Sequence, residues 1–215
     1  MTTSPTSPYP INQGSGYTEK QLAIIDAATR IFLEQGYRNA SMDAIAREAN
    51  VSKQTIYNQY GNKEALFSAV ITRNCQELLE TLQETGQARL DVQTTLSNFA
   101  TTLLDILLRP SSLALHRLIV AESARFPEVG AIYYREGPER GNRRLAEYLH
   151  QQCELGHLCI QDTLLAARQF TGGLISFLRT RALALNCPVT AAEIREVVDY
   201  TIACFMAMHG GSGKG

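Results

Sequence analysis

A short run of hydrogen-bonding side chains is the part of the chain best suited to chemistry with a polar partner. Within residues 53–59, reading KQTIYNQ, the only aliphatic residue is Ile56. On a helix this segment would bury Ile56 and present lysine, amide and hydroxyl groups to the solvent. In the DNA major groove, lysine can bond to guanine, Gln and Asn to adenine, and a threonine methyl can meet a thymine methyl. The polar side chains that this helix would present are Lys53, Gln54, Thr55, Tyr57 and Asn58.

The residues around this run predict a helix-turn-helix. Ser41 and Ser52 are good N-cap residues, and each precedes a short amphipathic segment. Asn50 occupies the turn, where a left-handed backbone suits asparagine best among the non-glycine residues. The small Ala46 would let two helices approach closely. A plain helical hairpin inside a bundle is the alternative, but it leaves the polar run unexplained. In a helix-turn-helix the second helix enters the major groove.

Polar groups near the starts of these helices are candidates for contacts to the DNA backbone. Phosphate contacts set the register of a protein on DNA without reading its sequence. Lys63 also begins the next predicted helix, whose dipole favours an anion at that end. For Tyr57 a buried aromatic position is the alternative. These polar groups include Ser41 and Ser52 at the two N-caps and Lys63 at the start of the next helix.

Helical periodicity continues to the end of the chain, so we predict an all-α protein of about nine helices. An N-terminal three-helix helix-turn-helix domain would precede a C-terminal helical bundle. Further helices are expected over residues 18–35, 62–84, 91–108, 112–125, 128–154, 162–183 and 190–209. The 128–154 segment should break at Gly137-Pro138. The expected ranges are a disordered arm at 1–16, a DNA-binding domain at 17–64, the bundle at 65–209 and a flexible tail at 210–215.

Charge and composition limit how the chain could bind nucleic acid. The net charge is −1 over 215 residues, and the pI is about 6.4. Up to residue 64 the basic and acidic residues balance, so a few placed groups must make the DNA contacts. These residues are Lys20, Arg30, Arg38, Arg47, Lys53 and Lys63 against Glu19, Asp26, Glu34, Asp43, Glu48 and Glu64. Because neither a secretory signal nor a membrane-length apolar run occurs, we expect a cytoplasmic protein.

Weaker clusters suggest neither catalysis nor a cofactor. His150, Cys153, His157 and Cys159 are of types that bind zinc, but a helix end carrying rings and buried thiols is the simpler interpretation. The five cysteines are most simply buried apolar residues of a reducing compartment. Arginines at 135, 140, 143 and 144 alternate with glutamates, which favours a solvated face of salt bridges over an anion site. No nucleophile–base set or glycine-rich phosphate loop occurs, so we expect no enzyme, no cofactor and no metal.

The chain resembles the TetR/AcrR family of bacterial transcriptional regulators. The resemblance rests on AIIDAATRIFLEQGYRNASMDAIAREANVSKQTIYNQYGNKEALF, within about residues 20–66. Downstream, RLIVAESARFPEVGAIYYREGPER resembles the effector domain of the AefR-like branch. The chain departs from the family in having Asn50 where Gly is usual and Gln59 where His is common. The left-handed backbone accommodates the first change, and Gln can still donate to a phosphate.

The resemblance implies a ligand-responsive repressor that binds a near-palindromic operator as a homodimer and is released by a small-molecule effector. By position, it also implies base-edge contacts from Lys53, Gln54, Thr55 and Asn58, and phosphate contacts from Ser41, Ser52, Tyr57, Gln59 and Lys63. An activator or an effector-independent DNA-binding protein of the same fold is the alternative. A further alternative is an enzyme or metal-binding protein that carries a helix-turn-helix.

Residues 65–209 would then bind the effector and dimerise. We expect the effector pocket to be lined by a mainly apolar set, each member of which is alternatively plain core: Phe99, Leu103, Leu107, Leu118, Glu122, Tyr133, Tyr134 and Phe170. The last two helices would form the dimer interface through exposed apolar faces, comprising Leu174, Phe177, Leu178, Ile194, Val198, Ile202 and Phe205.

Overall fold

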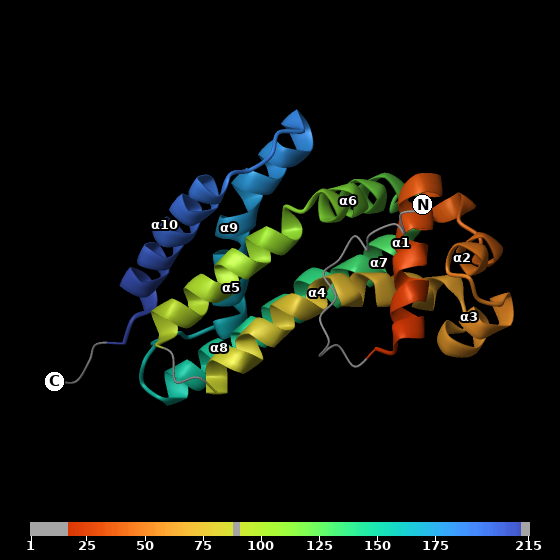
Figure 1. Ribbon diagram of the computed structural model, residues 1–215. Coiled ribbons are helices and arrows are strands. Elements are labelled where there is room, and N and C mark those ends of the chain that lie inside the picture. The colour runs from red at the N-terminus through yellow and green to blue at the C-terminus, as the bar shows by residue number, and fades with distance from the viewer. Residues whose placement is uncertain (1–16, 88–90, 212–215) are drawn as a thin grey trace, which may run out of the picture. The chain divides into compact units, whose positions relative to one another are not determined.

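The computed structural model describes residues 17–87 and 91–211, with the side chains of residues 77–87 left out (Figure 1). The predicted disordered arm, 1–16, and residues 212–215 of the predicted tail lie outside the described residues. Within those residues the protein is all-α, as predicted, and the β-type pairing consists of an isolated bridge between Leu158 and Gly210. The elements are α1 (Glu19–Asn39), α2 (Met42–Glu48), α3 (Lys53–Tyr60), α4 (Lys63–Gln87), α5 (Val92–Leu107), α6 (Pro110–Glu122), α7 (Pro127–Tyr134), the π-helix η1 (Arg135–Glu139), α8 (Arg140–Glu154), α9 (Thr163–Leu185) and α10 (Ala191–His209).

Side-chain caps explain where several helices begin. Thr18 and Thr190 form capping boxes with Gln21 and Glu193, and Asp91 and Asp162 accept backbone N–H bonds at the starts of α5 and α9. Each of these satisfies N–H groups that a helix start leaves without an intrahelical acceptor.

Glycine and proline residues lie where a helix kinks, begins or changes type. Gly36 has a φ of 77° and kinks α1, where the predicted helix ends. The helix predicted over residues 91–108 ends at Leu107, and Pro110 is the first residue of α6, where a missing N–H costs nothing. The predicted break at Gly137-Pro138 lies inside η1. A π-helical turn at this point accommodates a residue that cannot donate a backbone hydrogen bond.

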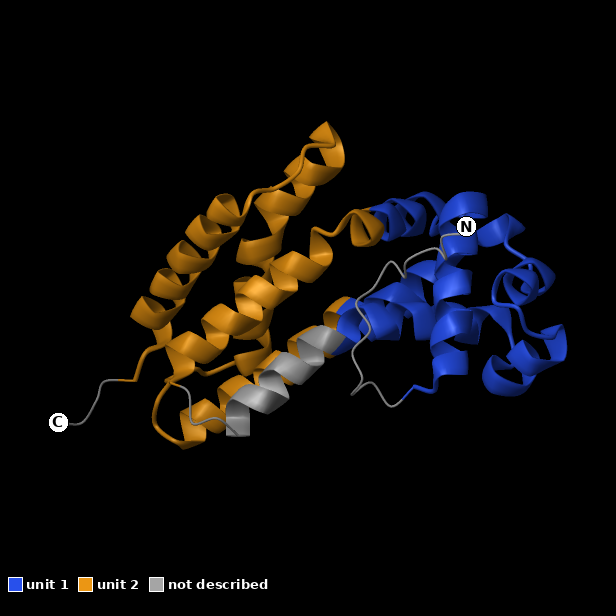
Figure 2. Ribbon diagram, viewed as in Figure 1, with its two compact units in different colours: residues 1–76, 114–137 blue, residues 77–113, 138–215 orange. Residues whose placement is uncertain are grey.

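The chain divides into two compact units (Figure 2). Unit 1 contains residues 1–76 and 114–137, and unit 2 contains residues 77–113 and 138–215. The sequence predicted a domain boundary near residue 64. In the structure, most of α6 and all of α7 pack with the N-terminal helices in unit 1. The long α4, the start of α6 and η1 are where the chain passes between the units.

Unit 1 is built on an aromatic and aliphatic core. Phe32, Tyr37 and Phe67 meet with ring centroids 5.2–5.7 Å apart, and Phe126 lies 5.8 Å from Tyr37. Aliphatic residues of α1 to α4 complete this core together with Leu115, Ile119, Val129 and Ile132 from α6 and α7. The segments between residues 114 and 137 are therefore part of the same packed body as the helix-turn-helix.

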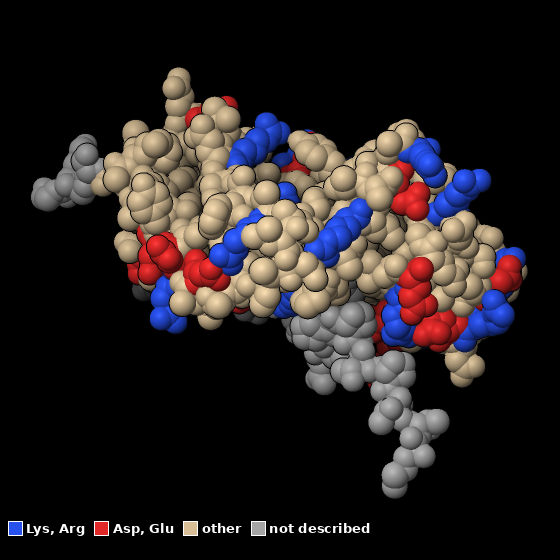
Figure 3. All heavy atoms as spheres, turned by 90° about the horizontal axis from the view of Figure 1, so that it is seen from above, with Lys and Arg blue, Asp and Glu red and all other residues tan. Residues whose placement is uncertain are grey.

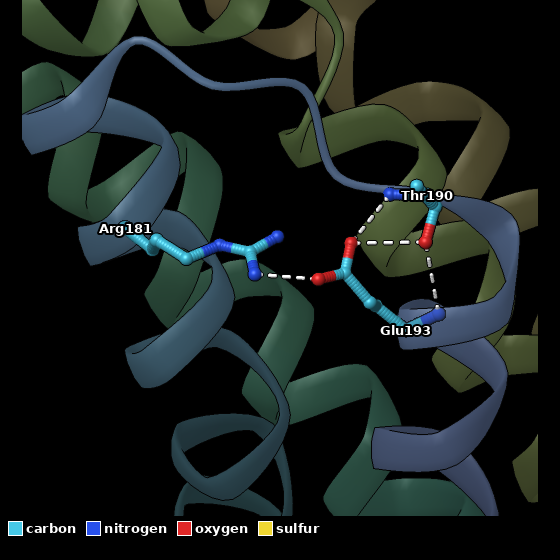
Figure 4. A network of polar contacts seen from close by, with 3 residues as sticks. All are labelled: Arg181, Thr190 and Glu193. Carbon is cyan, nitrogen blue, oxygen red and sulfur yellow. Dashed lines mark hydrogen bonds and ion pairs between the residues drawn. The ribbon is translucent and has the colours of Figure 1, made fainter.

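Unit 2 packs α5, α8, α9 and α10 around a second core. Polar contacts hold α9 and α10 together where the chain turns between them (Figure 4). Glu193 accepts the backbone N–H and hydroxyl of Thr190, and its other carboxylate oxygen accepts a hydrogen bond from Arg181. Near the end of α10, Cys159 N–H donates to the carbonyl of His209 at 2.9 Å. Both ends of α10 are thereby tied to neighbouring segments of the unit.

Candidate nucleic-acid interface

The geometry of α2 and α3 follows from the capping and turn residues. Ser41 Oγ accepts the N–H of Ala44 at 3.1 Å, and Ser52 Oγ accepts that of Thr55 at 3.1 Å. Asn50 has a φ of 51°, the left-handed conformation predicted for the turn. Ile56 is fully buried in the unit 1 core, which fixes the face that α3 turns outward.

The outward face of α3 carries the hydrogen-bonding groups predicted to meet DNA. Lys53, Gln54, Asn58 and Gln59 are exposed, and Thr55 is half-buried. Gln54 Nε2 donates to Asn58 Oδ1 at 2.7 Å, so these two amides form one paired unit on the helix surface. Tyr57 is 40% exposed, which excludes the buried aromatic position considered for it.

Acidic residues of α2 form ion pairs that the sequence did not reveal. Asp43 Oδ2 lies 2.8 Å from Lys53 Nζ, and Glu48 Oε1 lies 2.8 Å from Nε of Arg30 on α1. The hydrogen bond to Asp43 raises the pKa of Lys53 above its ordinary value, so Lys53 is a cation at neutral pH. Sequence spacing could not identify either pair, because the angle between helices decides which residues meet.

Charges of both signs are mixed on the surface (Figure 3). Toward the right of that view, where unit 1 lies, Asp and Glu side chains lie directly beside Lys and Arg side chains. This agrees with the balanced charge count of the first 64 residues. On the face shown in Figure 3, the charged side chains of unit 1 form no broad patch of one sign.

The ammonium of Lys63, unlike the side chains of the other candidates, is bonded to backbone carbonyls of unit 1. Its ammonium donates to the carbonyls of Tyr37, Arg38 and Ala40 at 2.9, 3.3 and 3.1 Å. It also lies 4.6 Å from the centroid of the Tyr37 ring. The side chain therefore caps the kinked end of α1, and the group left for a phosphate is the backbone at the start of α4.

Tyr37 is buried in the core of unit 1, and Tyr60 is half-buried and packs against that core. Burial raises the pKa of Tyr60 to about 12, with a smaller contribution from Tyr17. Burial also raises the pKa of Tyr37, and the Glu64 and Glu128 carboxylates add to the effect. Both phenols stay neutral at physiological pH.

The eight residues predicted to line an effector pocket do not share one core. Phe99, Leu103, Leu107 and Phe170 pack in the core of unit 2. The others belong to unit 1: Leu118 packs on its core, Tyr133 lies 3.3 Å (Oη to Nδ1) from His116, Glu122 lies near Gly36, and Tyr134 is 54% exposed. Periodicity identifies apolar helix faces but not which faces meet.

The predicted dimer residues require a correction. Leu174, Leu178, Ile194, Val198, Ile202 and Phe205 were expected to be exposed, but they are at most 9% exposed and belong to the chain's own core. Only Phe177, which is 65% exposed, is on the outside. The most continuous apolar stripe of each helix is the one that the subunit itself buries. The large apolar residues that α9 and α10 leave exposed are on other faces and include Phe177, Tyr200 and Met208.

The remaining sequence-based expectations concern metals, cysteines and membranes. No group of three or more metal-ligating residues gathers in the described part of the chain. His157 instead pairs with Gln152, at 2.9 Å between Nδ1 and Oε1. The expectation of buried cysteines is wrong for Cys159, Cys187 and Cys204, which are exposed. Arg135, Arg143 and Arg144 do pair with neighbouring glutamates. Among the described helices, none is both long and apolar enough to span a membrane.

Comparison with known proteins identifies both halves of the chain. Residues 24–70 match the family model described as bacterial regulatory proteins, tetR family, and residues 94–210 match the AefR-like transcriptional repressor, C-terminal domain. A TetR-family regulator from Mesorhizobium loti is 28% identical, with a TM-score of 0.76 over 90% of this chain and 100% of that one. The flavonoid-responsive regulator FrrA is 32% identical, with a TM-score of 0.70 over 90% and 98% of the two chains.

A curated relative supports the same conclusion. The HTH-type transcriptional regulator YhgD of Bacillus subtilis is 27% identical over 138 residues, which cover 64% of this chain and 69% of the relative. The helix-turn-helix geometry, the two family matches and the similar structures agree. The chain therefore belongs to the TetR family of DNA-binding transcriptional regulators, with a C-terminal domain of the AefR-like repressor type.

Proposed function

We propose that the protein is a repressor that binds a near-palindromic operator as a homodimer and leaves it when a small molecule binds. The observation that carries the proposal is the outward face of α3. Fixed by the buried Ile56, it presents Lys53, Gln54 and Asn58 as exposed groups on one short helix. These side chains can pair with purine edges, and each good base contact discriminates by about 1–3 kcal/mol.

The backbone contacts would come from groups around this helix. Ser41, Ser52, Tyr57 and Gln59 are exposed near the ends of α2 and α3, where contacts to phosphates set the register. Lys63 would contribute through the backbone at the start of α4, since its ammonium donates to carbonyls of α1 and its following residue.

The dimer is proposed from the outer faces of α9 and α10. One α3 covers only a few base pairs, so two copies set about 34–36 Å apart would be needed to read a specific site. On α10, Tyr200, Cys204 and Met208 are exposed at a spacing of four residues, which places them along one stripe. On α9, Phe177 is exposed beside the small Ser176 and Thr180. Large apolar groups open to solvent are suited to a subunit interface.

The effector would act by binding one conformer of the dimer better than the other. A ligand shifts such an equilibrium only by its difference in affinity for the two states. The long α4 supports a role as the connecting element, since it begins beside α3 and continues into unit 2. FrrA is a flavonoid-responsive regulator, so flavonoids are the first compounds to test here.

The test begins by selecting binding sites from a random DNA pool with the purified protein. The selected sequence should be a near-palindrome, and gel-shift titration should show loss of affinity in Lys53→Ala and Gln54→Ala. Lys20→Ala removes the same charge from an exposed position at the start of α1 and serves as the control. Unchanged affinity in both α3 variants would exclude this helix as the reader.

An activator of the same fold is the second candidate. FasR of Mycolicibacterium smegmatis, described as a transcriptional activator, is 33% identical over 66 residues, 31% of this chain and 30% of that one. A reporter gene placed behind the selected operator separates the two candidates. Expression that rises on deletion of the protein supports repression, and expression that falls supports activation.

A further inference from the structure

We propose that Asp43 is a specificity-determining residue, which acts as the counter-ion of Lys53 and so disfavours binding to DNA of arbitrary sequence. The proposal rests on the proposed function, since it assumes that Lys53 of α3 meets DNA. Asp43 itself lies on α2, and its ionised carboxylate cannot donate a hydrogen bond to a phosphate.

The contact joins two helices at the surface that would face DNA. Asp43 Oδ2 accepts a hydrogen bond from Lys53 Nζ at 2.8 Å, and both side chains stay open to solvent, at 62% and 47% exposure. The other candidate readers are paired as well: Gln54 with Asn58 at 2.7 Å, and Ser52 with Thr55 at 2.9 Å between hydroxyl oxygens. Among these pairs, the one between Asp43 and Lys53 joins opposite charges. It therefore changes how strongly this part of the surface attracts a phosphate.

The consequence follows from the number of donors on an ammonium group. Lys53 has three N–H donors, and Asp43 accepts from one of them. Two remain, and guanine presents two acceptors, N7 and O6, in the major groove. A guanine at the correct position can therefore bind Lys53 without displacing Asp43.

A phosphate of arbitrary DNA is attracted less strongly by the same lysine. Non-specific affinity comes from cations that replace the counter-ions condensed on DNA. Lys53 already has a carboxylate counter-ion, and that carboxylate would repel an approaching phosphate. Asp43 should therefore lower non-specific affinity more than it lowers affinity for a site with guanine in place.

The same helix supplies a matched control. Glu48 also lies on α2, is exposed and forms a 2.8 Å ion pair, but its partner is Arg30 of α1 rather than a residue of α3. Asp43→Asn and Glu48→Gln each remove one negative charge from the same seven-residue helix. Their bulk electrostatic effects on DNA binding should be similar, so a difference between them reports the contact with Lys53.

The experiment measures fluorescence anisotropy of two labelled duplexes, a random-sequence duplex and the operator selected by the wild-type protein, across a KCl series. The proteins are wild type, Asp43→Asn, Glu48→Gln, Lys53→Gln and the Asp43→Asn/Lys53→Gln double variant, each checked for folding by circular dichroism. We expect Asp43→Asn to bind the random duplex about three- to tenfold tighter, with a salt slope steeper by about 0.9 per subunit. Operator affinity should change less, so the specificity ratio should fall.

Glu48→Gln should alter either affinity by less than about twofold, and the gain from Asp43→Asn should vanish when Lys53 is already glutamine. Equal effects of Asp43→Asn and Glu48→Gln would overturn the proposal, as would a gain that persists in the double variant. If the wild type selects no operator, the proposed function fails. The random-duplex series still decides whether Asp43 restrains Lys53.

Discussion

Replacing Lys63 with methionine tests whether this lysine holds the N-terminal unit together rather than contacting DNA. Methionine keeps most of the apolar stem and removes the ammonium. In the structure that ammonium donates to three carbonyls around the end of α1, those of Tyr37, Arg38 and Ala40, and lies over the Tyr37 ring. All of these interactions would disappear together.

The expected loss of stability follows from the burial of these contacts. The bonds to Tyr37 and Ala40 are partly buried and the bond to Arg38 is exposed, at 2.9, 3.1 and 3.3 Å. With about 1 kcal/mol for each partly buried bond and a smaller amount for the exposed bond and the ring contact, Lys63→Met should lower the free energy of unfolding by about 2–3 kcal/mol. For a protein of this size the melting temperature should fall by about 4–12 °C.

Thermal unfolding and DNA binding together decide the outcome. Lys20→Met is the control, because Lys20 is an exposed lysine on the same unit, and its melting temperature should stay near that of the wild type. A phosphate contact by the Lys63 ammonium predicts the opposite pattern. Stability would be unchanged, and the salt slope of DNA binding would fall by about 0.9 per subunit. That pattern would refute the capping role.

Three further changes test other parts of the structure. Phe177→Glu should dissociate the proposed dimer in analytical ultracentrifugation, whereas Val120→Glu, which changes a similarly exposed residue of unit 1, should not. The hydrogen bond from Arg181 lowers the pKa of Glu193 from 4.5 to about 2, so the stability from its charged form is present above pH 4.5 and is lost toward pH 2. In denaturant titrations, the free energies of unfolding of wild type and Glu193→Gln should become equal as the pH falls over that interval. Asn50 has a φ of 51°, so Asn50→Ala should destabilise the protein by about 1 kcal/mol and Asn50→Gly should not.

Local sequence signals predicted the helix-turn-helix well because they act over a few residues. Ser41 and Ser52 cap the helices they were expected to cap, and Asn50 has the expected left-handed backbone. Ile56 is the buried residue of α3, as its place among polar neighbours indicated. Each of these depends on a side chain and its nearest backbone, so no tertiary contact had to be known.

Signals that depend on which faces meet were less informative. The apolar stripes of α9 and α10 were recognised, but the subunit uses Leu174 and Ile202 for its own core and leaves Phe177 and Tyr200 outside. Hydrophobic periodicity shows that a face will be buried, and does not show whether the same chain or a second copy buries it. The predicted pocket residues divide between two cores for the same reason.

The sequence by itself determined that the chain is helical, where its recognition helix begins and which side chains that helix presents. Only the tertiary structure decided how those side chains are used. Asp43 and Lys53 belong to different helices and meet because the turn at Asn50 sets the angle between them. Lys63 reaches carbonyls at the end of α1, beyond the kink at Gly36. Charge pairing and capping across helices depend on distances of a few ångströms, and only the packed fold sets those distances.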